Sequence, residues 1–414
     1  MAVEPAPPAK GGGYRALLSD RNFRFVFLSG SAGDTGYAVY SIAILWLAYR
    51  VSGSLAVAGL VLFVEFGVYS LSFLVGPFVD RVADLRTVLL IGYPIQALFA
   101  FLIGLLQLEG RLTTFALLAL VIALSVVWDF TWTASQAILP RVVSGEALFR
   151  ANGLLGAVNG GNQIAGYAAG AGLILLVGPA GGALLYAGLN LAGAVFALPI
   201  RAPLGASTRT GYLDELRDGW RYLSAGDGHP RLQFVAFSSA QGLFSAAPAL
   251  LIALLAASRF DAPASSYGIL FTAFAIGGVV GSLAIGQLNP RQRLTEFLVG
   301  IGLVEGGLVV VAVQAAPMLW PSIAAWFAVG AFDVGFYTAY IAYLQATTPP
   351  PLVARTLTNA YFPRGGARAI GGLLVGVLAL SLSATTLGVI VGGAFVAAAL
   401  AGPALLPAVR RLRF

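Results

Sequence analysis

Cysteine is absent from this chain of 414 residues, and histidine occurs once, as His229. Without cysteine a disulfide framework and thiolate chemistry are impossible, and a single histidine leaves little for a transition-metal site. Charged residues are also scarce, at 10%, where a soluble domain carries about 25%. These shortages exclude a soluble enzyme, a secreted disulfide scaffold and a disordered protein.

Apolar residues, in contrast, make up 58% of the chain and form long uninterrupted runs. A bilayer core of about 30 Å is crossed by roughly 20 apolar residues in a helix. Strands of a membrane barrel are shorter, at about 10 residues, and alternate in polarity. The runs therefore predict an all-α membrane protein with twelve transmembrane helices, at residues 23–48, 55–79, 87–108, 114–137, 151–177, 182–200, 231–257, 267–288, 294–316, 320–344, 357–380 and 385–407.

Basic residues fall almost entirely on one side of these predicted helices. If the N-terminus, every second loop and the C-terminus share a side, that side holds 19 of the 24 Lys and Arg residues. The opposite side holds three, which are Arg50, Arg111 and Arg259. The positive-inside rule then predicts a multi-pass protein of the cell membrane with both termini in the cytoplasm. Topology thus accounts for the net charge of +7, and we expect no nucleic-acid partner.

The chain also contains an internal repeat. Residues 25–33 align with 234–242, and Asp129 aligns with Asp333 further along at nearly the same offset. Two halves of six helices with the same direction predict a parallel repeat, with the functional site between the halves. The expected organisation is a flexible cytoplasmic N-terminus, a first bundle, a linker with a short surface helix, a second bundle and a tail, at residues 1–22, 23–200, 201–230, 231–407 and 408–414.

Two loops carry a resemblance to a known family. The first reads Gly76-Pro77-Phe78-Val79-Asp80-Arg81, with Arg86 following, and resembles the Gly-x-x-x-Asp-Arg signature of the major facilitator superfamily. The second, residues 138–154, is similar to the corresponding loop of exporters of drugs and siderophores, including enterobactin exporters and macrolide efflux proteins. The resemblance covers essentially the whole chain and implies the major facilitator fold. It also implies a cytoplasmic gate made of Gly76, Asp80, Arg81, Arg86 and Arg141.

An ionisable group in a bilayer is costly, so one that is present in a predicted span is a candidate functional residue. Acidic residues in the predicted spans are therefore candidates for a proton-coupling or cation site. Asp34 is the first candidate, followed by Glu65, Asp129 and Asp333. Glu305 is a weaker one, since the resemblance implies that its helix is peripheral. The alternative for each acid is structural, as a hydrogen-bonding contact between helices.

Aromatic and polar residues near these acids predict a substrate cavity. Aromatic rings beside an acid can line a cavity for a flat, partly cationic solute by stacking and cation–π contact; ordinary packing is the alternative. Arg364 and Arg368 share a helix face, and either line the cavity or reach the headgroups if the helix starts at Pro363. The predicted lining is Asp34, Trp128, Trp132, Asn159, Gln163, Phe336, Tyr337, Tyr340, Arg364 and Arg368.

These features together predict a secondary active transporter that exports an amphipathic organic solute, a drug or a siderophore, by proton-coupled alternating access. The sequence holds no phosphate-binding loop, so ATP is excluded as the energy source. We expect a monomer that interacts with a small organic substrate, protons and the lipid bilayer, without a cofactor, metal or enzymatic activity. The alternatives are uptake, transport of a lipid-like solute, and a receptor or scaffold that transports nothing. His229 lies in the linker and is expected to have no role.

Overall fold

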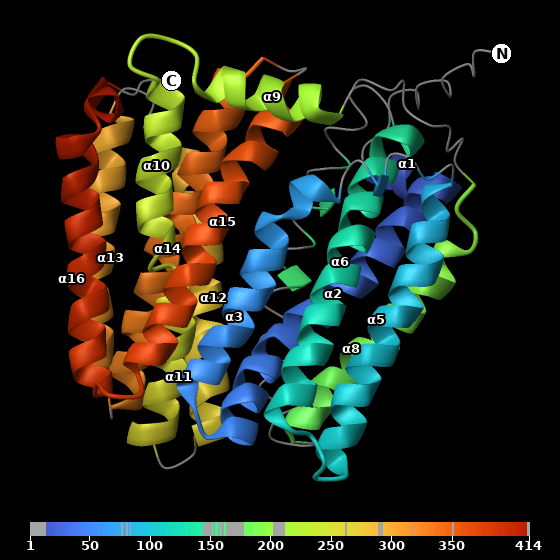
Figure 1. Cartoon of the computed structure of the whole chain (residues 1–414), viewed down its shortest axis with the longest axis horizontal. Coiled ribbons are helices and arrows are strands. Elements are labelled where there is room, and N and C mark those ends of the chain that lie inside the picture. The colour runs from blue at the N-terminus through green and yellow to red at the C-terminus, as the bar shows by residue number, and fades with distance from the viewer. Residues whose placement is uncertain are drawn as a thin grey trace. The chain divides into compact units, whose positions relative to one another are not determined.

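The computed structural model describes residues 14–75, 78–79, 82, 84–143, 151, 154–155, 158, 161–162, 178–201, 212–260, 263–288, 293–316, 318–349 and 352–411. Within these ranges the chain is helical and no strand is assigned (Figure 1). The principal helices are α1 (Tyr14–Ser19), α2 (Arg21–Ser52), α3 (Leu55–Ser70), α5 (Leu85–Leu108), α6 (Thr114–Val142), α8 (Pro179–Ala197), α9 (Tyr212–Leu223), α10 (Pro230–Gly242), α11 (Ala247–Arg259), α12 (Pro263–Leu288), α13 (Leu294–Ala315), α14 (Leu319–Thr347), α15 (Val353–Leu378) and α16 (Ala384–Leu405), with short turns at Ser72–Leu74 and Pro407–Arg411.

Most of these helices are long and apolar enough to cross a bilayer. The described residues contain eight such spans, one of which, Pro230–Arg259, covers both α10 and α11. Large apolar side chains such as Phe115 and Leu283 are exposed on them, at 84% and 67%. Exposed apolar surface of this kind is stable against acyl chains and not against water. The protein is therefore a multi-pass membrane protein, as predicted.

Helix ends follow local sequence signals. The side chains of Ser54, Asp84, Thr113 and Ser383 each accept a hydrogen bond from a backbone N–H in the first turn of the following helix. Such N-caps satisfy donors that the helix itself leaves unpaired. Gly53, with a φ of 66°, follows the last residue of α2 and adopts the left-handed conformation that favours glycine.

The boundaries differ from the predicted spans in three places. The predicted span 231–257 is interrupted at residues 243–246, where α10 ends and α11 begins. Helix α3 ends at Ser70 and not at residue 79. Helix α15 begins at Val353 and contains Pro363 in its interior, so the alternative that the helix starts at this proline is wrong. The predicted span 151–177 lies largely outside the described residues.

The contacts divide the chain into two compact units. The first unit comprises Met1–Leu47 and Leu74–Arg209, and the second comprises Ala48–Phe73 and Thr210–Phe414. These boundaries do not follow the two sequence halves, because the segment that carries α3 groups with the later helices. The division into bundles at residues 23–200 and 231–407 remains a prediction from the repeat.

In the first unit, α5 packs against both α6 and α8 (Figure 1). Small residues allow these contacts. A Cβ atom at Gly92 of α5 would lie 2.2 Å from the Thr131 side chain of α6, and one at Gly104 would lie 2.7 Å from Leu184 of α8. Close approach at glycine provides dispersion contacts between membrane helices, which lack a hydrophobic driving force in lipid.

In the second unit, the closest helix pairs are α12 with α14 and α13 with α16. Cβ atoms at Gly277 and Gly281 of α12 would lie 1.8 and 1.9 Å from backbone carbonyl oxygens of Phe327 and Ala331 in α14. Gly306 of α13 meets the backbone of α16 in the same way, with 2.4 Å to the carbonyl oxygen. The backbones therefore touch at these points without intervening side chains.

Helix α3 packs antiparallel along α15 within the second unit. Gly59 lies against the backbone of Gly372 and Gly376 near one end of the pair, and Ser70 lies against Gly365 near the other. Between these points the Arg368 guanidinium stands 4.0 Å from the centroid of the Phe66 ring. This contact thus continues over almost the whole length of α3.

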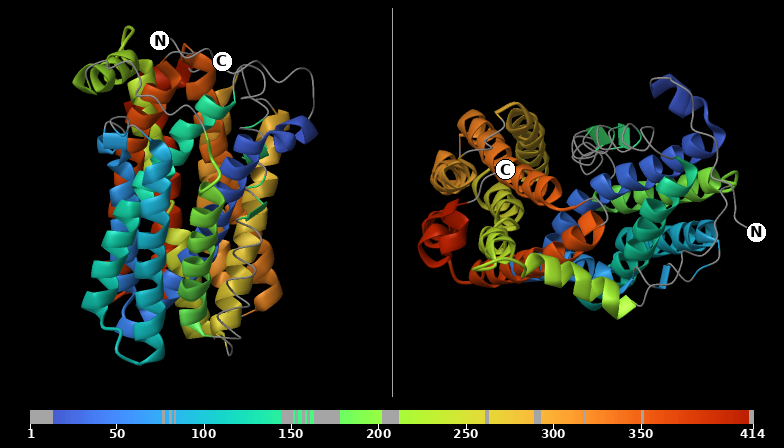
Figure 2. Two further views of the ribbon diagram at one scale, coloured as in Figure 1. Left: turned by 90° about the vertical axis from the view of Figure 1, so that its right-hand side faces the viewer. Right: turned by 90° about the horizontal axis from the view of Figure 1, so that it is seen from above.

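The linker contains the predicted short helix, α9, which crosses the ends of the longer helices of the second unit at a steep angle (Figures 1 and 2). Its Leu223 is fully buried, and Trp220 packs against the same apolar cluster. The Tyr222 hydroxyl donates a hydrogen bond to the Thr347 carbonyl oxygen, and Arg231 lies 4.2 Å from the Tyr222 ring centroid. These contacts fasten α9 to the ends of α10 and α14.

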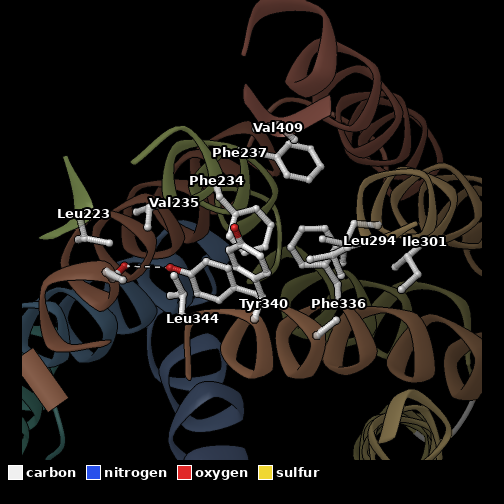
Figure 3. Close-up of a cluster of buried hydrophobic side chains, with 14 residues drawn as sticks. Leu223, Phe234, Val235, Phe237, Leu294, Ile301, Phe336, Tyr340, Leu344 and Val409 are labelled. Atoms are coloured by element: carbon white, nitrogen blue, oxygen red, sulfur yellow. Dashed lines mark hydrogen bonds between the residues drawn. The ribbon is translucent and has the colours of Figure 1, made fainter. Parts of the chain in front are cut away.

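The apolar cluster beneath α9 forms the core of the second unit (Figure 3). Phe234 of α10 packs on Tyr340 and Tyr343 of α14, with ring centroids 5.3 and 4.7 Å apart. Phe336, one turn away, meets Phe237 edge-on at 5.8 Å. Phe336 and Tyr340, both predicted to line the substrate cavity, are therefore buried members of this core, at 3% and 0% exposed.

Alanine at Gly281 is expected to lower the thermal stability of the protein, because the new Cβ would lie 1.9 Å from a backbone oxygen of α14. Overpacking of this kind costs about 1–3 kcal/mol. The measurement is the midpoint of thermal unfolding in detergent. Gly307→Ala is the matched control, since a Cβ there meets none of the described atoms within 4 Å. Equal midpoints for both variants would contradict a backbone contact between α12 and α14.

Candidate functional site

The first unit contains a cavity of about 260 Å³ between α2, α5 and α6. It brings together three of the predicted site residues, Asp34, Trp128 and Trp132. The remaining lining residues are Val26, Gly30, Gly33, Tyr93, Gln96, Thr131, Ser135, Gln136, Leu139 and Leu155. A concave site of this kind, with a few polar groups among apolar ones, is typical of small-molecule binding.

Helix geometry places these side chains on the cavity wall. Gly30, Gly33 and Asp34 are spaced three and four residues apart on α2, and therefore share a face. Tyr93 fills the space beside Gly33, where a Cβ atom would lie 3.1 Å from its ring. A bulkier residue at position 33 would thus displace the Tyr93 side chain from the cavity wall.

Stacked aromatic rings form one wall of the cavity. Trp128 and Trp132, one turn apart on α6, have ring centroids 6.1 Å apart with planes inclined by 18°. Trp128 also stacks on Tyr37 of α2, with centroids 5.1 Å apart and planes inclined by 27°. Both indoles are partly exposed, so a solute in the cavity meets aromatic surface next to the Asp34 carboxylate.

A buried hydrogen-bond network fixes the polar floor of the cavity. The Gln96 side-chain amide donates to the Thr131 hydroxyl at 2.7 Å, and the Tyr186 hydroxyl donates to the Gln96 amide oxygen at 2.8 Å. The Tyr93 hydroxyl donates to the Ser29 carbonyl oxygen at 3.3 Å. Because each of these groups has a partner, the network holds the wall residues in one arrangement.

The charge of the cavity is one-sided. Among its lining residues in the described part of the chain, Asp34 is the one carboxylate and none is basic. Asp34 is partly exposed and lies well inside α2, thirteen residues after Arg21. A carboxylate without a neighbouring base attracts either a proton or a cationic solute, because burial penalises an isolated charge.

Asp129 is placed differently from Asp34, although both were predicted to couple protons. It follows Trp128 on α6 but does not line the cavity, and it is 1% exposed. Neither of its carboxylate oxygens has a hydrogen-bond partner in the part of the chain that is described, and the same holds for Thr133 one turn later. The structure thus gives Asp129 no partner that would hold a fixed negative charge.

The second unit contains a separate polar cluster around Arg364. The α15 helix begins eleven residues before Arg364, which places this residue about 16 Å along the helix axis at 1.5 Å per residue. The Arg364 Nε donates to the Ser238 hydroxyl of α10 at 3.1 Å. Its guanidinium lies 4.8 Å from the Tyr337 ring centroid and 5.8 Å from that of Tyr340. Arg364 is 7% exposed and is therefore buried among these side chains.

Two acids interact electrostatically with this cluster. Asp333 of α14 interacts with both Arg364 and Arg368, and Glu305 of α13 interacts with Asp333 and Arg364. The cluster therefore unites five of the predicted residues, Asp333, Tyr337, Tyr340, Arg364 and Arg368, with Glu305, which ranked lowest among the acids. Glu65 of α3 is partly buried in the same unit.

The predicted cytoplasmic gate is described only in part. Arg86 donates to the Leu198 and Ile200 carbonyl oxygens at the end of α8, both at 3.2 Å, and lies 3.7 Å from Asp84. A cation at a helix C-terminus is stabilising, so these contacts stabilise the packing of α5 against the end of α8 within the first unit. Arg141 is partly buried at the end of α6. Gly76, Asp80 and Arg81, together with the predicted cavity residues Asn159 and Gln163, lie outside the described residues.

Sequence reasoning missed several cavity residues. Tyr93, Gln96, Thr131, Ser135 and Gln136 all line the cavity. A signal existed on α6, since Trp128, Thr131, Trp132 and Ser135 recur at helical spacing. No comparable signal marks Gln96, because its partners Thr131 and Tyr186 come from other helices.

Solved structures with the same fold are transporters. The nucleoside transporter NupG has a TM-score of 0.71 at 13% identity, over 93% of this chain and 99% of its own. A POT family transporter in complex with 5-aminolevulinic acid has 0.74 at 13%, over 97% and 98%. A bacterial homologue of the iron transporter ferroportin in an inward-facing state has 0.68 at 15%, over 94% and 98%. At these identities the likeness shows the fold alone.

The fold and the polar groups inside the helices define a membrane transporter of the major facilitator type. A family profile described as "Transmembrane secretion effector" matches residues 13–411. The chain belongs to this family. A comparison with curated proteins gave no match. The predicted superfamily is thus confirmed, while the enterobactin and macrolide exporter branch remains a prediction.

Phenylalanine at Tyr186 is expected to lower the free energy of unfolding, because it leaves the buried Gln96 oxygen without its donor. The loss of one partner of a buried hydrogen bond costs about 1–3 kcal/mol. The measurement is unfolding in detergent, with Gln96→Leu and the double variant completing a cycle. An equal effect of Tyr186→Phe in both backgrounds would show that the hydrogen bond contributes nothing.

Proposed function

We propose that this protein exports an amphipathic organic cation in exchange for protons, by alternating access. The observation that carries the proposal is the first-unit cavity, in which a single carboxylate, Asp34, lies beside the Trp128 and Trp132 rings. Indole faces attract cations at about 0.5–2 kcal/mol per contact. A carboxylate adds charge recognition, and the aromatic wall adds recognition of a flat apolar body.

Exchange follows from competition for one carboxylate. A proton and an organic cation both bind the ionised form of Asp34, so occupancy by one opposes binding of the other. Such mutual exclusion is a negative coupling between two ligands and is reciprocal by linkage. A proton gradient then drives the cation in the opposite direction, provided that the cavity opens to each side of the membrane in turn.

Two further observations bear on direction and solute. The family description refers to secretion, which supports export. The solved structures with this fold include a nucleoside transporter, a POT family transporter in complex with a peptide conjugate, and a homologue of the iron transporter ferroportin. The amide and hydroxyl groups of Gln96, Gln136 and Ser135 at the cavity also suit a solute with hydrogen-bonding edges. Uptake and a lipid-like solute are the alternatives that a flux measurement separates.

Asparagine at Asp34 is expected to abolish proton exchange, because a neutral amide neither binds a proton nor pairs with a cation. Ethidium, a flat aromatic cation, is added outside proteoliposomes that hold the pH dye pyranine. With the wild-type protein its entry expels protons and raises the internal pH. With Asp34→Asn the rate falls to that of protein-free liposomes.

Asp227→Asn is the matched control, since this aspartate is exposed in the loop after α9 and its variant retains the wild-type rate. Full proton movement with Asp34→Asn would reject the assignment of this residue. A wild-type protein that moves no protons on addition of ethidium would reject export of aromatic cations.

A further inference from the structure

Glu305 lies in the interior of α13 and is 2% exposed. Its Oε1 atom is buried and has no hydrogen-bond partner in the described part of the chain. A buried ionised carboxylate normally accepts several hydrogen bonds or pairs with a base. Within the described ranges the Oε1 atom has no such partner, although Arg364 is close enough to interact with Glu305 electrostatically.

The charged groups that face Glu305 come from two neighbouring helices. Asp333 of α14 opposes its negative charge, and Arg364 of α15 favours it. Helix α16, which packs closely on α13, carries no ionisable side chain. On the remaining side, α10 contributes the neutral side chain of Gln241, which lies against Gly302 one turn before Glu305.

The two acids of this cluster are not equivalent. Asp333 faces both arginines, whereas Glu305 faces Arg364 and is opposed by Asp333. Arg364 is in turn engaged by the Ser238 hydroxyl and the Tyr337 ring. When two carboxylates share a site, the proton resides on the one with less positive charge around it.

From this geometry we propose that Glu305 is a proton-binding site, in addition to the cation site at Asp34. With Oε1 unpartnered among the described residues, this arrangement is assigned to the protonated form of the carboxyl group. Deprotonation breaks the O–H bond, transfers the proton to water, and leaves a carboxylate that pairs with the Arg364 guanidinium. The Arg364 Nε donates to Ser238, so the terminal guanidinium nitrogens are the donors for this pairing, and the proton changes the contact between α13 and α15.

The charge of the cluster changes by one unit in this step. With Glu305 protonated, two arginines face the single negative charge of Asp333, and the cluster has a net charge of +1. Deprotonation brings it to zero. Because an uncompensated charge inside a membrane is costly, the two states favour different arrangements of the same helices.

Gln241 is placed to assist the exchange. It is 3% exposed, and neither its amide nitrogen nor its amide oxygen has a hydrogen-bond partner in the described ranges. A Cβ atom at Gly302 would lie 2.7 Å from the Gln241 nitrogen, so glycine at this position leaves room for the amide. The amide is available to donate to the Glu305 carboxylate once the proton has left.

The inference rests on the proposed function only in taking the proton as the coupled ion, and its test needs no transported solute. Infrared spectra of the purified protein in lipid report the C=O stretch of protonated carboxylic acids. Other carboxyl groups also absorb in acidic buffer, and we expect one component band, lost in alkaline buffer, to come from Glu305. Glu305→Gln removes this band. Glu296→Gln, on the same helix but exposed, retains it.

Glu305→Asp keeps the acid and serves where the amide fails to fold, and it shifts the band without removing it. A band unchanged by both substitutions at position 305 would overturn the proposal, as would a Glu305 band that persists in alkaline buffer. The result is independent of the pyranine assay, because a Glu305 band that titrates stands even where ethidium moves no protons, and the reverse also holds.

Discussion

The structure depends on how few ionisable side chains a bilayer-spanning helix can carry. A charge in the hydrocarbon region is tolerated where a partner or water meets it. In the described residues most of these groups lie in two places, at Asp34 beside the first-unit cavity and at the Arg364 cluster of the second unit, while Asp129 of α6 and Glu65 of α3 are in neither. The remaining helix surface is apolar, and large side chains such as Phe115 are exposed to lipid.

Close contacts at glycine pack together the helices that carry the ionisable residues of the second unit. Lipid supplies no hydrophobic drive between helices, so close backbone approach has to provide the attraction. Gly277 and Gly281 bring α12 onto α14, which carries Asp333, while Gly306 brings α13 onto α16 opposite Glu305. The same residues that shorten the distance between backbones thus fix the helices that present the charges.

The two centres differ in the chemistry that they offer. The first has one carboxylate, an aromatic wall and no base among the described lining residues, and it is open enough to form a cavity. The second balances two acids against two arginines in a tightly packed interior. An open anionic site suits a solute, whereas a closed cluster of opposite charges suits a proton that changes which pairs are made. In the proposed mechanism this difference separates solute binding at Asp34 from a second proton site at Glu305.

The sequence by itself determined the class of protein, because span length, hydrophobicity and the distribution of arginine are properties of the chain that do not depend on packing. It also predicted Asp34 with Trp128 and Trp132, since an acid and helically spaced aromatics are visible without a structure. Only the tertiary structure decided that Phe336 belongs to an apolar core, that α3 groups with the later helices, and that Glu305 meets Asp333 and Arg364. Those outcomes depend on which faces of distant helices meet in the folded protein. The sequence alone does not show which residues far apart in the chain come into contact.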